Sequence, residues 1–107
     1  MIFKVVYGIV NGDGTIDQDS LSDPQNPTFS VTRLKTGYYT VTFQQKFKHK
    51  PSVVAQLVAR TSAENSSTLD NWFVYNISTT EFSIKTGTQS ATPGDYPFCF
   101  HAVGEVS

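Results

Sequence analysis

Charge is scarce in this sequence. Lysine, arginine, aspartate and glutamate make up 16% of its 107 residues, and the net charge at pH 7 is −1. A protein that binds nucleic acid through its phosphates needs a strongly basic surface, so we expect no nucleic-acid partner. A weakly charged surface rich in tyrosine and threonine instead suits neutral ligands or protein partners.

Cysteine and long apolar runs are also scarce. The single cysteine, Cys99, excludes an intrachain disulfide. No apolar run approaches the ~20 residues that span a bilayer, so we expect no membrane insertion. The apolar N-terminus is interrupted by Gly8, carries its lysine late and precedes no small-residue cleavage site, so it predicts a strand rather than a signal peptide. The location stays open between the cytoplasm, a virion and the cell surface reached by non-classical export.

The residues that are present predict β-structure. Good helix formers are few, whereas tyrosine, phenylalanine, threonine and valine are common, as in strands. The segment after Gly37 alternates cleanly and places Tyr39, Val41 and Phe43 on one face, which we expect to be core. In the strand that starts at Trp72, we expect the odd-numbered face with Phe73 to point inward. Seven strands are predicted: Ile2–Val10, Phe29–Leu34, Tyr38–Phe47, Ser52–Arg60, Trp72–Ser78, Phe82–Thr86 and Tyr96–Gly104.

Short strands with turn signals between them, and no linker or repeat, predict one domain over residues 1–107, a compact antiparallel β-sandwich. Some apolar residues fall on the outward faces of these strands. They are Val54, Val58, Cys99 and Val103. An exposed apolar patch needs a reason, and a subunit interface supplies one, so we expect a homo-oligomer.

The segment Asn11–Asp17 resembles the middle of an EF-hand calcium loop. Its ligand positions 1 and 12 would be Ile9 and Ser20, which cannot replace the missing carboxylates. The glycines instead predict a polar turn. The basic run Lys46–Lys50 could attract phosphate or an acidic glycan. On an exposed strand, however, its lysines would serve to discourage aggregation.

No catalytic or metal-binding motif is evident. His49 and His101 lack further ligands at metal-binding spacing. Cys99 and His101 share a strand face, but no third group orients them for nucleophilic catalysis. We therefore expect no metal, no cofactor and no enzyme activity. A small hydrolase that uses His101 or Asp95 is kept as a weaker alternative.

Parts of the chain resemble known families. In the second half, Phe47–Leu57 contains a proline followed by Val-Val-Ala-Gln-Leu, and the hairpin Val74–Ile84 and the ending Phe98–Gly104 follow it. This pattern resembles the H-type lectin domain. In the first half, Tyr7–Gly14 and Phe29–Phe43 are similar to small domains at the tips of phage tail fibres and bacterial surface fibres.

These resemblances imply a β-sandwich that assembles as a homotrimer, with sugar sites near the protomer boundaries and galactose or N-acetylgalactosamine-like ligands. The chain departs from the lectin pattern at two places. The binding arginine of that family lies early in the strand that here begins at Asn71 and Trp72. The tryptophan expected before the last strand is replaced by Asp95 and Tyr96.

Our sequence-based hypothesis is a lectin-like, carbohydrate-binding domain that recognises cell-surface glycans through loops at one end. Tyr38, Trp72 and Tyr96 are the candidate aromatic platforms, and 61–72 and 87–96 are the candidate loops. The predicted contacts are Arg60, Asn71, Trp72, Asp95 and Tyr96. The alternative is a structural or receptor-binding module of a phage or bacterial fibre that trimerises and binds a protein partner.

Overall fold

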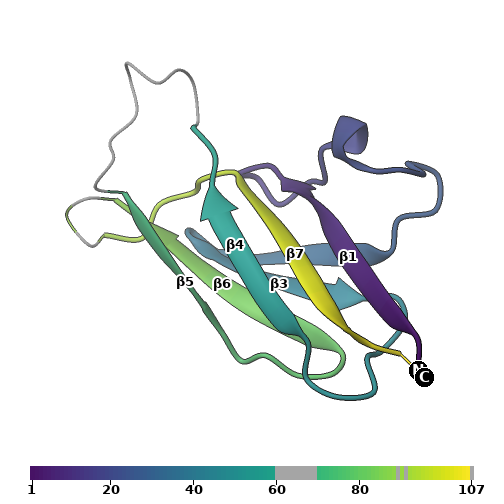
Figure 1. Ribbon diagram of the computed structural model, residues 1–107. Coiled ribbons are helices and arrows are strands. Elements are labelled where there is room, and N and C mark those ends of the chain that lie inside the picture. Colours follow the sequence, from purple (N-terminus) through teal and green to yellow (C-terminus); the bar gives the residue numbers. More distant parts are fainter. Residues whose placement is uncertain (60–69, 89, 91, 107) are drawn as a thin grey trace.

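The computed structural model describes residues 1–59, 70–88, 90 and 92–106. Two antiparallel sheets face one another, and the N- and C-termini lie together (Figure 1). A three-stranded sheet has the order β1-β7-β4, and a four-stranded sheet has the order β2-β3-β6-β5. The strands are β1 (Phe3–Val10), β2 (Phe29–Lys35), β3 (Tyr38–Phe43), β4 (Ser52–Leu57), β5 (Asn71–Tyr75), β6 (Glu81–Gly87) and β7 (Phe98–Glu105). The all-β prediction is confirmed. The one helical element among the described residues is a short 3-10 turn, η1 (Gln18–Ser20).

Five predicted strands were too long. Ile2–Val10 starts one residue early and Ser52–Arg60 runs past the end of β4 at Leu57, and the other three overruns have a local reason. β3 ends at Phe43, because the chain then turns and buries Phe47 completely, its ring meeting Phe43 edge-on at 5.0 Å. The lysines at 46, 48 and 50 therefore lie in a loop, and the prediction of an exposed strand was wrong for them. β5 stops at Tyr75, because Asn76 has a positive φ of 52°. β7 starts after Pro97, which cannot donate to a ladder.

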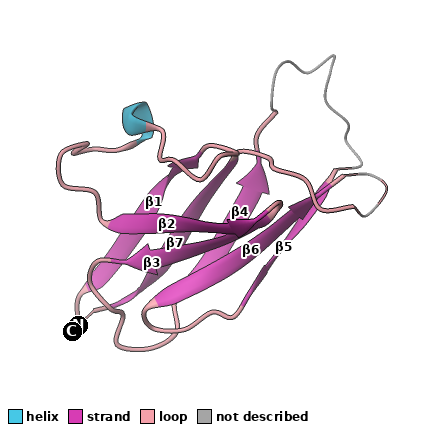
Figure 2. Cartoon of the chain, turned by 180° about the vertical axis from the view of Figure 1, so that it is seen from behind, coloured by secondary structure: helices cyan, strands magenta, loops and turns pink. Residues whose placement is uncertain are grey.

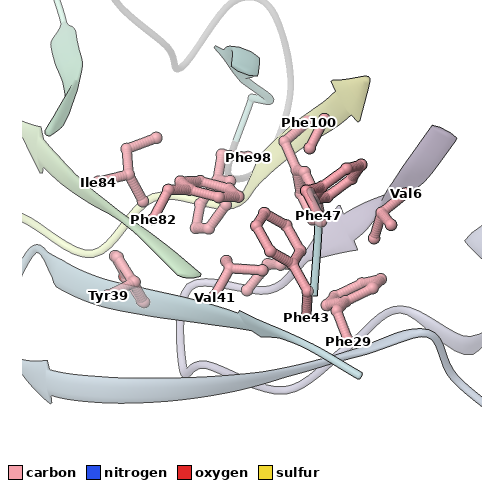
Figure 3. Close-up of a cluster of buried hydrophobic side chains, with 12 residues drawn as sticks. Val6, Phe29, Tyr39, Val41, Phe43, Phe47, Phe82, Ile84, Phe98 and Phe100 are labelled. Atoms are coloured by element: carbon pink, nitrogen blue, oxygen red, sulfur yellow. The ribbon is translucent and has the colours of Figure 1, made fainter. Parts of the chain in front are cut away.

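The core between the two sheets is largely aromatic (Figure 3). Phe29 meets Phe100 edge-on at 4.9 Å, and Phe82 meets the same ring at 5.1 Å. Phe100 thus joins the three-stranded sheet to two strands of the other sheet. Edge-to-face pairs of this kind add to the stability that burial supplies. The predicted core face of β3 (Tyr39, Val41 and Phe43) is confirmed, with all three side chains at most 5% exposed.

The predicted face of β5 was wrong. Phe73 is 55% exposed, whereas Trp72 and Val74 pack against the core. The pairing register explains this, because Trp72 lies opposite Thr86 and Val74 lies opposite Ile84. Both of those partners are buried residues of β6. The neighbouring strand therefore decides which side of β5 points inward.

The outward apolar residues of the three-stranded sheet lie where alternation placed them. Val54 is 58% exposed, Val103 is 40% exposed and Cys99 is half-buried, while Val58, just past the end of β4, is 37% exposed. Seen from the other side, the four-stranded sheet comes to the front (Figure 2). Its outer face carries polar and aromatic side chains instead. The two faces of the molecule thus differ in chemistry.

Candidate functional site

The five predicted glycan contacts fall into separate places. Arg60 and residues 61–69 of its loop lie outside the described residues. Asn71 and Trp72 begin β5. Asp95 and Tyr96 lie in the segment that leads to β7. The structure brings Asn71 and Trp72 together in a surface hollow, which neither Asp95 nor Tyr96 lines.

Asp95 is held by internal partners. Its carboxylate accepts hydrogen bonds from Arg33, with Nη2 at 2.8 Å, from the main-chain N–H of Gly37 at 2.8 Å and from the phenol of Tyr39 at 3.0 Å. The phenol of Tyr39 also faces the carbonyl oxygen of Gly12 at 2.7 Å. These contacts connect the N-terminal turn, the β2–β3 turn and the segment before β7. The carboxylate thus holds loops in place and has little capacity left for a ligand.

The electrostatics of this cluster agree with a structural role. Hydrogen bonds from Arg33 lower the pKa of Asp95, and those from Gly37 and Tyr39 add to the effect. Burial, followed by the hydrogen bond to Asp95, raises the pKa of the Tyr39 phenol. Both groups therefore keep their ordinary charge at neutral pH, the carboxylate ionised and the phenol neutral.

Tyr96 is only 4% exposed. Its ring has no open face on which a sugar could stack, so it supports the fold beneath the loop. The sequence placed Tyr96 at the surface because serine, threonine, glycine and proline surround it. Nothing in that composition reveals that the segment folds the ring inward.

The hollow at the start of β5 has a volume of about 170 Å³. It lies between the first residues of β5, the last residues of β6 and the segment that follows β6. We call it the β5–β6 hollow. Its lining residues are Asn71, Trp72, Phe73, Lys85, Thr86, Gly87, Thr88 and Pro93.

Trp72 holds one side of the β5–β6 hollow rigidly. Its indole N–H donates to the carbonyl oxygen of Ala55 in β4 at 2.8 Å, which fixes the ring between the edges of the two sheets. The Asn71 side chain accepts a hydrogen bond from the main-chain N–H of Trp72 at 2.8 Å. Asn71 is exposed, so the amide stands at the rim of the hollow.

Phe73 belongs to a cross-strand row that spans the outer face of the four-stranded sheet. The register places Lys35, Tyr38, Lys85 and Phe73 opposite one another on β2, β3, β6 and β5. The ammonium of Lys85 lies 5.1 Å from the centre of the Tyr38 ring and 5.9 Å from that of Phe73. The ammonium of Lys35 lies 4.6 Å from the Tyr38 ring. We call these four residues the aromatic–lysine row.

Sequence reasoning flagged only one member of the aromatic–lysine row, Tyr38. Phe73 was assigned to the core, and Lys35 and Lys85 were not singled out. The four residues are spread over 51 positions of the chain, from Lys35 to Lys85. They meet only through the pairing of four strands, which a single sequence does not reveal.

A second, wider hollow lies on the outer face of the three-stranded sheet. Its volume is about 510 Å³, and most of its surface is apolar. The register stacks Tyr7, His101 and Val54 in one row, and Ile9, Cys99 and Gln56 in the next. We call this surface the β1–β7–β4 face.

The described residues contain no group of three or more histidine, cysteine, aspartate or glutamate side chains that could hold a metal ion. In the same part of the chain, no helix is long and apolar enough to cross a membrane. No family model, curated protein or solved structure matches this chain. The resemblances to H-type lectins and to fibre tips therefore stay predictions.

Proposed function

We propose that this protein is a non-catalytic carbohydrate-binding module that takes its ligand in the β5–β6 hollow. The observation that carries the proposal is the exposed ring of Phe73, placed in a hollow beside the amide of Asn71 and the ammonium of Lys85. An aromatic face stacks on the apolar C–H face of a sugar, and amide and ammonium groups hydrogen-bond its hydroxyls.

The hollow suits a ligand because it is fixed before binding. Trp72 is held by its hydrogen bond to Ala55, and β5 is paired along its length with β6. A rigid site loses little conformational entropy when it binds. The proposal keeps Asn71 and Trp72 from the predicted contacts, adds Phe73 and Lys85, and assigns Asp95 and Tyr96 to the support of the fold.

We further propose that the protein assembles as a homotrimer through the β1–β7–β4 face. Val54 and Val103 are exposed there, and the half-buried Cys99 lies between Ile9 and Gln56 on the same face. Water-exposed apolar surface of this kind is stabilised by contact with a second copy. Because the two proposed surfaces lie on different sheets, a trimer leaves each β5–β6 hollow open. Three weak sugar sites on one particle then bind a glycan-coated surface with avidity.

A glycan array tests the function, with the wild-type protein beside two matched variants. Phe73→Ala removes the proposed platform, and Ile2→Ala removes a similarly exposed apolar side chain, 58% exposed, from the residue before β1. Wild type and Ile2→Ala are expected to bind the same glycans, and Phe73→Ala is expected to bind none. Equal binding by all three proteins would place the sugar site elsewhere.

The second candidate function is a structural module of a phage or bacterial fibre that binds a protein partner. The 510 Å³ hollow on the β1–β7–β4 face favours it, because protein interfaces bury apolar and aromatic side chains such as Val54 and Tyr7. A folded oligomer that binds no glycan on the array would support this function over the first.

A further inference from the structure

The ligand class of the β5–β6 hollow follows from the charges beside it, an argument that rests on the proposed glycan-binding function. We propose that the preferred ligand is an acidic glycan. A carboxylate on the sugar binds the ammonium groups of Lys35 and Lys85, and the sugar ring stacks along Phe73 and Tyr38. The low net charge of the whole chain suggested a neutral ligand, whereas the local positive charge of the aromatic–lysine row favours an anionic one.

The two lysines converge on one ring. Lys35 and Lys85 pair with Tyr38 from the strands on either side of it, and their ammonium groups lie 4.6 and 5.1 Å from the ring centre. These distances are typical of cation–π contacts, so both positive charges lie beside the same ring. An anion that binds next to this ring is attracted by both charges and can form a charge-assisted hydrogen bond to either ammonium.

Among the described residues, neither lysine forms an ion pair with a carboxylate. The ion pairs among the described residues are Arg33–Asp95 and Lys48–Glu105. On β6, the outer-face carboxylate of Glu81 is four residues from Lys85, about 13 Å along a strand. That separation exceeds the roughly 8 Å over which salt screens charges at physiological ionic strength. The positive charge of the row is therefore available to a ligand.

The phenol of Tyr38 reports the positive charge at this position. Its interaction with the Lys85 ammonium lowers the pKa of Tyr38, and the nearby charge of Lys35 acts in the same direction. The same field that favours a phenolate favours a bound carboxylate. The rings of Tyr38 and Phe73 lie on either side of Lys85. A sugar ring can stack on them, whereas a simple inorganic anion would make no use of them.

The aromatic–lysine row also continues into the hollow. Phe73 and Lys85 line the hollow and belong to the row as well. Asn71, two residues before Phe73 on β5, sits opposite Gly87, and both residues line the hollow. A sugar ring in the hollow therefore has its carboxylate within reach of Lys85, and a neighbouring sugar extends over Tyr38 toward Lys35.

Five soluble probes test this inference by retention and by titration. Polygalacturonate carries a carboxylate on each sugar, and its methyl ester has the same sugars without the charge. Sialyllactose places the carboxylate on a terminal sugar, and lactose lacks it. Dextran sulfate reports simple ion exchange. We expect polygalacturonate or sialyllactose to bind at least tenfold more tightly than its neutral counterpart. Binding of polygalacturonate would indicate an internal uronic acid as the ligand, and binding of sialyllactose would indicate a terminal sialic acid.

Two double variants that lose the same charge separate local from general attraction. Lys35→Gln with Lys85→Gln removes the row, and Lys46→Gln with Lys50→Gln removes two exposed lysines from the loop before β4. The first is expected to weaken acidic-probe binding at least tenfold, and to weaken neutral-probe binding less, because a neutral sugar loses only its hydrogen bond to Lys85. The second is expected to change neither. Circular dichroism confirms that both remain folded.

Three outcomes would overturn the inference. Equal binding of an acid and its neutral counterpart, with loss of both in Phe73→Ala, would remove the carboxylate preference but keep the proposed function. If dextran sulfate binds more tightly than the acidic glycans, and both double variants weaken that binding equally, the attraction is nonspecific ion exchange. Binding of no probe by the folded wild-type protein would remove both the inference and the function beneath it.

Discussion

The indole N–H of Trp72 donates a hydrogen bond to the carbonyl oxygen of Ala55 at 2.8 Å and so joins edge strand β5 of one sheet to edge strand β4 of the other. Trp72→Phe removes this bond and keeps most of the apolar ring. We expect it to lower the free energy of unfolding by about 1 kcal/mol, the usual net value of such a bond. Urea denaturation measures the change.

The adjacent residue gives the matched control for this prediction. Phe73 is exposed, so Phe73→Ala should change stability by less than about 0.5 kcal/mol while it removes glycan binding. A Trp72→Phe variant as stable as the wild type would contradict the role of Trp72 as a connection between the sheets.

Asp95 predicts the pH dependence of stability. In the folded protein its pKa lies below the ordinary value of 3.8 for an aspartate, chiefly because Arg33 donates hydrogen bonds to it. The stability that Asp95 supplies is therefore complete above about pH 4 and is lost as the pH falls through the lower, folded-state pKa. Asp95→Asn should lower the free energy of unfolding at pH 7 by roughly 1–3 kcal/mol, because Tyr39 and Gly37 lose a charged acceptor.

A series of urea melts from pH 7 to pH 2 measures this dependence. The difference between wild type and Asp95→Asn should shrink toward acid. Asp13, whose pKa Thr15 lowers, is present in both proteins and cancels in that difference. A difference that stays constant with pH would show that the Asp95 charge contributes nothing.

Gly37 is expected to tolerate no side chain. Its φ is 79°, and an added Cβ would lie 2.6 Å from the carbonyl oxygen of Thr86. Gly37→Ala should therefore cost roughly 1–3 kcal/mol from backbone strain, with the steric contact in addition. Gly12→Ala is the control, because its nearest neighbour is the Asp95 carbonyl oxygen at an ordinary 3.4 Å. Thermal melts of both variants measure the effect. A lower melting temperature for Gly12→Ala than for Gly37→Ala would refute this explanation.

The proposed trimer predicts the effect of a charge on the β1–β7–β4 face. Val54→Glu places a carboxylate where apolar side chains should be buried, and we expect it to weaken association by about 3 kcal/mol, roughly a hundredfold. Ser30→Glu adds the same charge to the exposed β2 strand of the other sheet. Light scattering should give a trimer for wild type and Ser30→Glu, and a monomer for Val54→Glu. A monomeric wild type would contradict the assembly.

Local pattern predicted much of the fold and little of the site. The alternation around Tyr39 and Val41 is visible in the sequence, because every second residue must face the core. Phe73 was misassigned since Trp72 and Phe73 are both aromatic, and only the pairing with β6 decides between them. Asp95 binds Arg33 across 62 positions, so its internal role cannot be inferred from its neighbours in sequence.

The most direct test of the account uses Trp72 as its own reporter, because it is the single tryptophan of the chain and lines the β5–β6 hollow. The measurement is a titration of the wild-type protein with a panel of neutral and acidic oligosaccharides, followed by tryptophan emission. We expect a saturable change with at least one oligosaccharide, which Phe73→Ala abolishes. Constant emission with every member of the panel, from a protein that remains folded, would contradict glycan binding in this hollow.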